Sequence, residues 1–282
     1  MNNRRIVTLT AVSGILATLA GLLPGGTALA RPLTIKGSDT MVILAQRWAE
    51  KYMSVDHDAV IQVTGGGSGV GIAGLINGTT DIATASRMMT QDEKVKLRDR
   101  YQTMGTEIPV ARDGLSVYLN DKSPVKELSF DQLRDIYVGK LTNWKEVGGP
   151  DLRINLYGRE NSSGTYAFFK EVVLGGADYA PHCQTLPGTA AVVNAVAQDA
   201  AGIGYGGTAY AKGIRECAVR RHAGEPAVLP SAEAVKDGSY PLSRHLFFYL
   251  RKSPQGDAKK FVDWVLSPQG QSLVTEVGYF PV

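Results

Sequence analysis

Beyond its first 30 residues the sequence has no long hydrophobic run and no strong excess of charge of either sign. A helix that crosses a bilayer needs about 18 consecutive apolar residues, so the sequence after residue 30 contains no candidate for one. Lysine and arginine number 30 against 27 aspartates and glutamates, and the formal net charge is only +3. A nucleic-acid-binding protein would concentrate basic residues on one face. We therefore expect a soluble protein with no nucleic-acid partner.

Cysteine is also scarce, since the chain has only Cys183 and Cys217. In an oxidising compartment such a pair is expected to form a disulfide, and we predict one between these residues. His182 and His222 lie near the two cysteines, but the spacing matches no standard zinc pattern. We therefore expect no metal site and no other cofactor.

Residues 1–30 have the pattern of a secretory signal peptide. Arg4 and Arg5 form a short basic start, an uncharged apolar stretch follows, and residues 28–30 read Ala-Leu-Ala, which suits a cleavage site. The apolar core is too short for a stable membrane span. No cysteine lies near the cleavage point, which argues against a lipid anchor. We expect the mature chain to begin at Arg31 and to work in the periplasm.

After this leader, short strands alternate with amphipathic helices, which is typical of an α/β protein with mainly parallel sheets. Strands are predicted near residues 33–36, 59–63, 81–85, 108–120, 152–157 and 244–250. Helices are predicted near residues 41–52, 72–76, 90–101, 130–138, 166–174 and 258–266. The long strand at 108–120 could pass from one lobe into another, and the strand at 244–250 could bring the chain back.

Three predicted strand-to-helix turns combine glycine with serine or threonine, at residues 37–40, 67–69 and 162–165. The first backbone N–H groups of a helix lack partners within the helix, whose N-terminus carries about half a positive charge. Glycine lets the backbone approach a ligand closely, and hydroxyl groups add further donors. Three such turns facing one cleft could supply most of the hydrogen bonds that a tetrahedral oxyanion accepts.

Each turn taken alone has an ordinary structural interpretation. Ser38, Ser68 and Ser163 could be helix N-caps, and the glycines could simply allow tight turns. All three in one chain, with Arg159 just ahead of the third, favour a binding site instead. Arginine offers a planar fork of donors that suits paired hydrogen bonds to phosphate.

At these residues the chain resembles the phosphate-binding proteins of bacterial ABC phosphate importers, which have the type II periplasmic binding protein fold. The most specific match is Arg159 followed, after three residues, by Ser163-Gly164-Thr165. The resemblance covers about residues 33–280. It also includes the turns at 37–40 and 65–69 and the stretch from Asp113 to Trp144.

The resemblance implies an α/β fold of two lobes, each a mainly parallel sheet flanked by helices, with the ligand in the cleft between them. We place the lobe boundaries so that residues 31–112 and 239–282 form the first lobe and residues 113–238 form the second. The resemblance further implies a monomeric carrier that captures inorganic phosphate for the membrane permease of an ABC importer and catalyses no reaction.

The resemblance also implies which residues bind the anion. It transfers this role to Ser38, Thr40, the Met41 backbone N–H, Ser68, Arg159, Ser163, Gly164 and Thr165. From the same turns and from the end of the third strand we add Asp39, Gly67, Ser86 and Arg87 as candidate phosphate-binding residues.

One position departs from the family pattern. Well-known members end the third strand in Ala-Ser-Asp, where the aspartate accepts a hydrogen bond from protonated phosphate, whereas this chain has Ser86 followed by Arg87. Such an acceptor favours phosphate over sulfate, because sulfate carries no proton near neutral pH. We predict that Asp39 takes over this role, with helix capping as its alternative interpretation. Arg87 would then be a second ligand cation or the ion-pair partner of Asp39.

Other functions fit the sequence less well. Residues 69–74 match the dinucleotide pattern G-x-G-x-x-G, with Asp92 about 20 residues further on, but exported proteins seldom meet NAD. Ser68 lacks the second glycine of a hydrolase nucleophile elbow, and no histidine lies in the three turns. Two alternatives stay open: a carrier for another tetrahedral oxyanion such as sulfate or molybdate, and a secreted phosphate-ester enzyme on the same scaffold.

Overall fold

The computed structural model describes residues 31–282, so the predicted signal peptide lies outside the described residues. The strands are β1 (Leu33–Gly37), β2 (Ile61–Thr64), β3 (Ile82–Ala85), β4 (Thr106–Leu119), β5 (Glu127–Ser129), β6 (Asn155–Arg159), β7 (Gln184–Leu186), β8 (Gly202–Gly207), β9 (Arg215–Arg220) and β10 (Ser243–Leu250). The helices are α1 (Val42–Met53), α2 (Ser68–Asn77), α3 (Gln91–Tyr101), α4 (Phe130–Tyr137), α5 (Gly164–Val172), α6 (Thr189–Gln198), α7 (Ala232–Asp237), α8 (Gly256–Leu266) and α9 (Pro268–Val277). Short 3-10 helices are η1 (Trp144–Val147) and η2 (Thr208–Tyr210). None of these helices is long and apolar enough to span a bilayer.

Every predicted strand and helix is present, with ends shifted by a few residues. The spacing of apolar residues predicts these helices because each helix buries one face. Helix α1, for example, buries Trp48, whose Nε1 donates to the Gly270 carbonyl at 2.7 Å. The strand predicted at 152–157 is β6, which continues to Arg159. This arginine therefore ends a strand and is held by the sheet.

No strand or helix is predicted for residues 175–242, where the structure has β7, α6, β8, β9 and α7. Strand β8 reads Gly-Ile-Gly-Tyr-Gly-Gly, and glycine is normally depleted in strands. Here α6 packs closely on β8, since a Cβ at Gly204 would lie 2.6 Å from Val192 and one at Gly206 would lie 2.7 Å from Thr189. The strand therefore depends on a tertiary contact that local propensity does not reveal.

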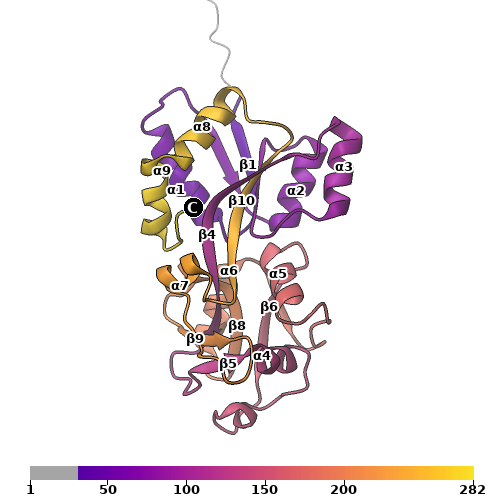
Figure 1. Cartoon of the computed structure of the whole chain (residues 1–282), viewed down its shortest axis with the longest axis vertical. Helices are drawn as coiled ribbons and strands as arrows, with labels where there is room; N and C mark the ends of the chain where they lie inside the picture. The colour runs from indigo at the N-terminus through magenta and orange to yellow at the C-terminus, as the bar shows by residue number, and fades with distance from the viewer. Residues whose placement is uncertain (1–30) are drawn as a thin grey trace, which may run out of the picture. The chain divides into compact units, whose positions relative to one another are not determined.

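The strands pair in the order β2-β1-β3-β10-β4-β8-β6-β7, with β9 also on β4 and β5 on β9. Pairs β1–β2, β1–β3, β5–β9, β6–β7 and β6–β8 are parallel. The antiparallel pairs β3–β10, β4–β10, β4–β8 and β4–β9 all include β4 or β10. These two strands run side by side through the middle of the described unit (Figure 1). The prediction of parallel sheets flanked by helices is confirmed, with two antiparallel strands joining them.

Two main hydrophobic cores lie towards opposite ends of the long strand β4. One core includes Trp48 and Phe248 and takes Val110 and Ala111 from the first part of β4. The other includes Trp144 and takes Leu115, Val117 and Leu119 from the second part of β4. The chain thus leaves one core and enters the other near residues 112–114, and the cores correspond to the two lobes of the fold. The residue boundaries of the lobes stay a prediction.

The predicted disulfide is wrong for this structure, because Cys183 and Cys217 are both free thiols. Cys217 lies on β9, whereas Cys183 immediately precedes β7. Strands β4, β8 and β6 lie between β9 and β7 in the sheet. With about 4.8 Å between neighbouring strands, the two residues are roughly 19 Å apart. A disulfide requires Cα atoms within about 7 Å, which this topology forbids.

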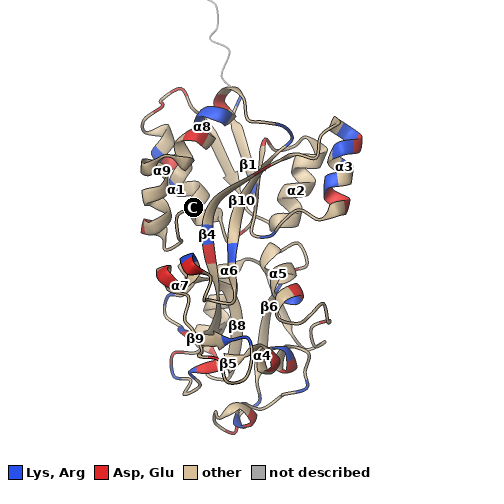
Figure 2. Ribbon diagram, in the orientation of Figure 1, with Lys and Arg blue, Asp and Glu red and all other residues tan. Residues whose placement is uncertain are grey.

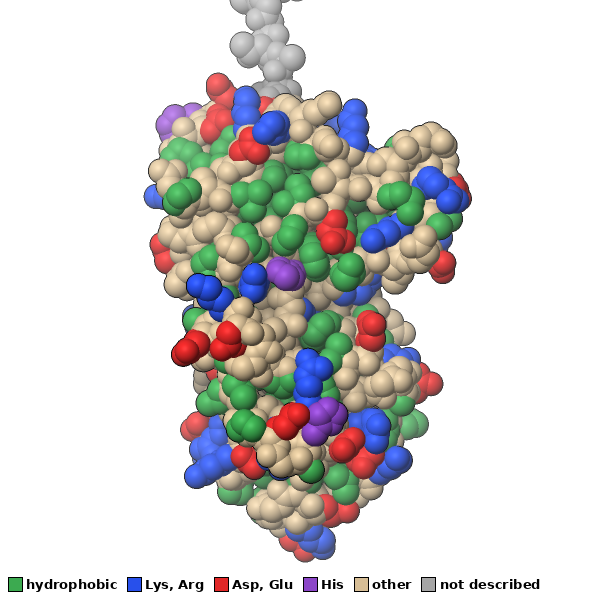
Figure 3. All heavy atoms as spheres, viewed as in Figure 1, with side chains coloured by type: hydrophobic (Ala, Val, Ile, Leu, Met, Phe, Trp, Pro, Cys, Tyr) green, Lys and Arg blue, Asp and Glu red, His purple; other side chains and the backbone are tan. Residues whose placement is uncertain are grey.

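Charged residues of both signs are interspersed on the face of the described unit that Figures 2 and 3 show. Helix α3 carries basic and acidic residues close together, as do α4 and α8, whereas α2 and α6 carry no charged residue (Figure 2). On the face shown in Figure 3, acidic, basic and apolar side chains are interspersed. This face therefore has no region dominated by one sign of charge.

Candidate anion-binding site

The first predicted turn follows β1 and crosses the end of β3. The Ser38 amide donates to the Thr84 carbonyl at 3.0 Å. The N-cap of α1 is Met41, which makes no side-chain cap, so neither Ser38 nor Asp39 is the N-cap of this helix. The Met41 amide, predicted to face the anion, donates to the Ser38 carbonyl at 2.9 Å. Tyr279 Oη donates to the Thr40 carbonyl at 2.6 Å, which fixes the turn from the C-terminal end of the chain.

The second turn packs directly against the first. Gly67 is the N-cap of α2 with φ +96°, a conformation that favours glycine, and its amide donates to the Gly37 carbonyl at 2.9 Å. Ser68 is the first residue of α2, and its Oγ accepts from the Ser86 amide at 3.0 Å. The capping interpretation is therefore wrong for Ser68, whose hydroxyl bonds to the end of β3.

The third turn precedes α5, which packs in the core that contains Trp144, and it contacts the second turn. Ser163 is the N-cap of α5, and its Oγ accepts from the Tyr166 amide at 3.3 Å, so the capping interpretation is correct for this serine. The Gly69 amide donates to the Ser162 carbonyl at 2.9 Å, which joins the turns. A Cβ at Gly164 would overlap Ser68 Oγ and lie 2.7 Å from Ser86 Oγ. Only glycine permits this approach.

Five hydroxyl groups, which we call the hydroxyl cluster, meet where the three turns converge. The cluster consists of Ser38, Thr40, Ser68, Ser86 and Thr165, each at most 1% exposed. Ser38 Oγ donates to Ser86 Oγ at 3.0 Å, and Ser68 Oγ lies 3.4 Å from Ser86 Oγ. Thr40 Oγ1 and Thr165 Oγ1 are 2.9 Å apart. The Thr40–Thr165 contact therefore joins hydroxyls from the two lobes, and Gly164 lies against Ser68 and Ser86.

Backbone donors add to the hydroxyl cluster. Within residues 31–282, no acceptor is found for the amides of Thr40, Ser68, Gly164 and Thr165. Ser68, Gly164 and Thr165 lie in the first turns of α2 and α5, where N–H groups have no partner in the helix. These amides and the hydroxyls can together donate to an anion with several acceptor oxygens.

Arg159 lies beside the cluster with its side chain only 1% exposed. Its Nη2 donates to Asp39 at 2.9 Å and to Glu160 at 2.7 Å, and its Nη1 donates to Thr189 Oγ1 at 2.9 Å. Burial alone would raise the pKa of Glu160, but the hydrogen bonds and charge of Arg159 outweigh it and hold that pKa below its usual value. Arg159 is thus a buried cation between two carboxylates.

Asp39 connects the first turn to the second and to Arg159. Its Oδ1 accepts from the Gly66 amide at 2.8 Å, and its Oδ2 accepts from Arg159. Tyr210 Oη donates to the Asp39 carbonyl at 2.7 Å. Burial, followed by the charge of Asp39, raises the pKa of Tyr210 to about 12, so this phenol keeps its proton. Donors from three parts of the chain therefore hold Asp39 next to the turns, two on its carboxylate and one on its backbone carbonyl.

The proposed ion pair between Asp39 and Arg87 is wrong. Arg87 instead donates from Nη1 and Nη2 to the two oxygens of Glu93, both at 2.8 Å. Glu93 also accepts from the Thr90 amide in the capping box of α3, so Arg87 is held by a local helix start. A Cβ at Gly69 would lie 3.8 Å from Arg87 Nη2, which places the guanidinium beside the second turn and outside the hydroxyl cluster.

Sequence reasoning missed a second buried arginine at the site. Arg244 pairs with Asp113, which is fully buried, at 2.7 Å, and also bonds to the Ser86 carbonyl and to Thr165 Oγ1. An arginine at the start of the apolar strand β10 was an available signal, since a buried charge requires a partner. The partner, however, is 131 residues away in sequence.

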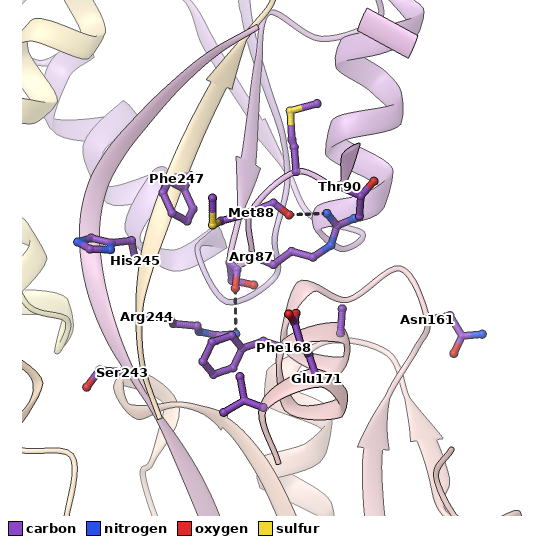
Figure 4. A pocket seen from close by; sticks show the side chains of 14 residues that line it. Arg87, Met88, Thr90, Asn161, Phe168, Glu171, Ser243, Arg244, His245 and Phe247 are labelled. Carbon is purple, nitrogen blue, oxygen red and sulfur yellow. Dashed lines mark hydrogen bonds between the residues drawn. The ribbon is translucent and has the colours of Figure 1, made fainter. Parts of the chain in front are cut away.

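A pocket of about 720 Å³ opens beside the hydroxyl cluster and is drawn in Figure 4. Ser86 and Arg244 belong to both the pocket lining and the site, while Phe168 and Phe247 provide apolar walls. The Arg244 guanidinium carbon lies 5.3 Å from the centre of the Phe168 ring, a cation–π distance. The site therefore has an apolar boundary on this side.

Comparison with known proteins identifies the family. A family model described as a PBP superfamily domain matches residues 24–269. The phosphate-binding protein PstS of Pseudomonas aeruginosa is 32% identical over 267 residues, covering 89% of this chain and 83% of the relative. PstS of Bacillus subtilis is 34% identical over 251 residues, covering 89% and 80%.

Solved structures agree with these relatives. A Clostridium perfringens protein assigned to phosphate ABC transport, solved with bound phosphate, has a TM-score of 0.80 and 29% identity, covering 89% of this chain and 100% of that one. An ABC-type phosphate transport receptor from Vibrio cholerae has a TM-score of 0.71, 29% identity and the same coverage. The fold is that of a type II periplasmic binding protein. The chain therefore belongs to the PBP superfamily and, within it, to the PstS family of phosphate-binding proteins.

Proposed function

We propose that this protein captures inorganic phosphate in the periplasm and delivers it to the membrane permease of an ABC importer. The observation that carries the proposal is the convergence of three turns on one hydroxyl cluster, with Arg159 beside it. The family membership and the phosphate-bound relative support the same ligand. Residues 1–30, read as a signal peptide, support export.

The site is built for binding. The hydrogen bonds within residues 31–282 join no cluster hydroxyl to a histidine or a carboxylate that could serve as a general base. Instead the hydroxyls bond to one another, to a backbone amide and to Arg244. These donors match the acceptor oxygens of phosphate, and burial strengthens each charge-assisted bond because water is excluded.

We further propose that the carboxylate of Asp39 accepts the phosphate proton. Asp39 is the acidic residue inside the first turn, and its two oxygens accept from Gly66 and Arg159. A carboxylate offers about four acceptor sites, so two such bonds leave room for a third. A carboxylate here would accept a hydrogen bond from protonated phosphate and would repel sulfate, which has no proton to donate.

Calorimetric titration of the phosphate-free mature protein near neutral pH tests both proposals. We expect saturable one-to-one binding of phosphate, with no binding of sulfate or molybdate at the same concentrations. Binding of sulfate or molybdate in place of phosphate would change the ligand and keep the carrier role. No binding of any of the three would contradict the proposed function.

The Asp39→Asn variant tests the acceptor separately. We expect its preference for phosphate over sulfate to decrease, because asparagine carries no charge and donates from its nitrogen. An unchanged preference in a folded variant would exclude Asp39 as the acceptor. Turnover of a phosphate ester by the wild-type protein would favour the enzyme alternative instead.

A further inference from the structure

Arg244 occupies a position where the two long strands of the fold meet. It lies directly opposite Asp113 in the antiparallel pairing of β10 with β4. Its Nε and Nη2 donate to Asp113 Oδ2 at 2.9 and 2.7 Å, and the two side chains are 4% and 0% exposed. A buried charge is tolerated only when it is paired, so Asp113 fixes the position of the guanidinium.

The remaining Arg244 donors reach both cores of the protein. Nη1 donates to the Ser86 carbonyl at 3.1 Å, a bond drawn in Figure 4, and Ser86 directly follows β3. Nη2 also donates to Thr165 Oγ1 at 3.0 Å, and Thr165 lies in the first turn of α5. A pair that only joined β4 to β10 would need neither contact.

The bond to Thr165 restricts where its hydroxyl proton can point. Arginine can only donate, and a hydroxyl has one proton and two acceptor positions. Thr165 Oγ1 therefore accepts from Arg244 and must direct its own proton elsewhere. The other close oxygen is Thr40 Oγ1 at 2.9 Å, so the two threonines share one hydrogen bond and retain one further proton to donate.

We propose that Arg244 is a positioning residue of the phosphate site, which orients the Thr165 hydroxyl so that the Thr40–Thr165 pair has one proton left to donate towards the bound anion. Asp113 holds the guanidinium in place, and Thr165 transmits its effect to the ligand. This inference rests on the proposed function, since it adds a residue to the same site. Without Arg244, the Thr165 hydroxyl is free to rotate and to turn an oxygen lone pair towards the anion, which opposes anion binding.

The test separates the charge of Arg244 from its hydrogen bonds. Arg244→Lys keeps a positive charge opposite Asp113, but one ammonium cannot reach Asp113, the Ser86 carbonyl and Thr165 together. We expect phosphate affinity, measured by calorimetry on the full mature protein, to decrease about tenfold. In a Thr165→Val background we expect Arg244→Lys to cause no further loss. In a Thr165→Ser background, which keeps the hydroxyl, the tenfold loss should return.

A matched control uses an arginine–carboxylate pair remote from the site. Arg220 Nη1 lies 2.6 Å from Glu127 Oε1, between β9 and β5, and Arg220→Lys should leave phosphate affinity unchanged. Thermal unfolding without phosphate establishes that each variant is folded before its affinity is compared.

The outcomes distinguish this inference from the proposed function. If wild-type protein does not bind phosphate, the proposed function is wrong and the inference falls with it. If wild-type protein binds and Arg244→Lys binds equally well, only the inference is wrong. An equal loss in the wild-type and Thr165→Val backgrounds would also overturn it, because Arg244 would then act independently of Thr165.

Discussion

Arg159 and Arg244 are both buried at the edge of the hydroxyl cluster, and their surroundings differ in an instructive way. Arg159 donates to two carboxylates, Asp39 and Glu160, and Glu160 is its neighbour in sequence. Within residues 31–282, Arg244 pairs with one carboxylate, that of Asp113. If Asp113 is removed, no second carboxylate among the described residues is left to pair with Arg244.

The two arginines also differ in their distance along the sequence from Thr165, a candidate anion-binding residue. Arg159 stands six residues before Thr165 at the end of β6, so one short segment carries both. Arg244 reaches Thr165 from β10, which enters the site from the far end of the chain. One arginine belongs to a local motif, and the other belongs to the tertiary fold.

Removing one carboxylate partner of each arginine should show the largest difference between the two pairs. Asp113→Asn leaves Arg244 buried without an anion, and we expect the free energy of unfolding to decrease by roughly 3 kcal/mol. This corresponds to a melting temperature lower by roughly 6–12 °C. Asp39→Asn is the matched variant: Asp39 is 18% exposed and Arg159 retains Glu160, so we expect a decrease of about 1 kcal/mol or less. Equal shifts in thermal unfolding would show that the pairs are equivalent.

Removing Arg159 should have its main effect on binding. Arg159→Ala removes a buried cation beside the site, and we expect phosphate affinity to decrease at least about thirtyfold, or roughly 2 kcal/mol. Calorimetric titration measures this loss, with Arg220→Ala as the control for an arginine pair elsewhere. A decrease of less than threefold would remove Arg159 from the binding site.

A smaller change tests how closely the third turn must approach the cluster. Gly164→Ala would bring a methyl group into Ser68 Oγ, and we expect phosphate affinity to decrease about tenfold. Gly69→Ala is the matched variant, because its Cβ would lie 3.3 Å from the Ser162 carbonyl, and we expect about a threefold loss at most. Equal affinities for these two variants, measured by the same titration, would mean that close approach at Gly164 is not required.

The smallest expected effect concerns Glu160, the second carboxylate of Arg159. Its pKa is lowered in the folded protein, so the folded state binds fewer protons than the unfolded state near that pKa. The contribution of Glu160 to stability is therefore present above its ordinary pKa of 4.5 and is lost as pH falls towards the folded value. We expect wild-type protein to melt above Glu160→Gln at pH 7 and this difference to shrink below pH 4.5. A melting-temperature difference between wild-type and Glu160→Gln protein that stays constant down to pH 3 would contradict a charged Glu160.

The sequence alone predicted the alternation of strands and helices, because each amphipathic element carries its periodicity locally, as α1 does around Trp48. It also predicted the three turns, because glycine permits the backbone conformations of a tight turn and hydroxyl side chains can bond to nearby backbone groups, and both properties are local. The structure brings together Ser38, Thr40, Ser68, Ser86 and Thr165 as predicted candidates. Gly164 lies against the same group.

Only the tertiary structure decided which charged groups pair and whether the two cysteines lie close enough to form a disulfide. Asp39 pairs with Arg159 and not with Arg87, and Arg244 pairs with Asp113 across two strands far apart in sequence. Cys183 and Cys217 stay apart because three strands separate theirs in the sheet. Periodicity and turn chemistry act over a few residues, whereas strand order and ion pairing depend on contacts between distant segments. Those contacts exist only once the chain has folded.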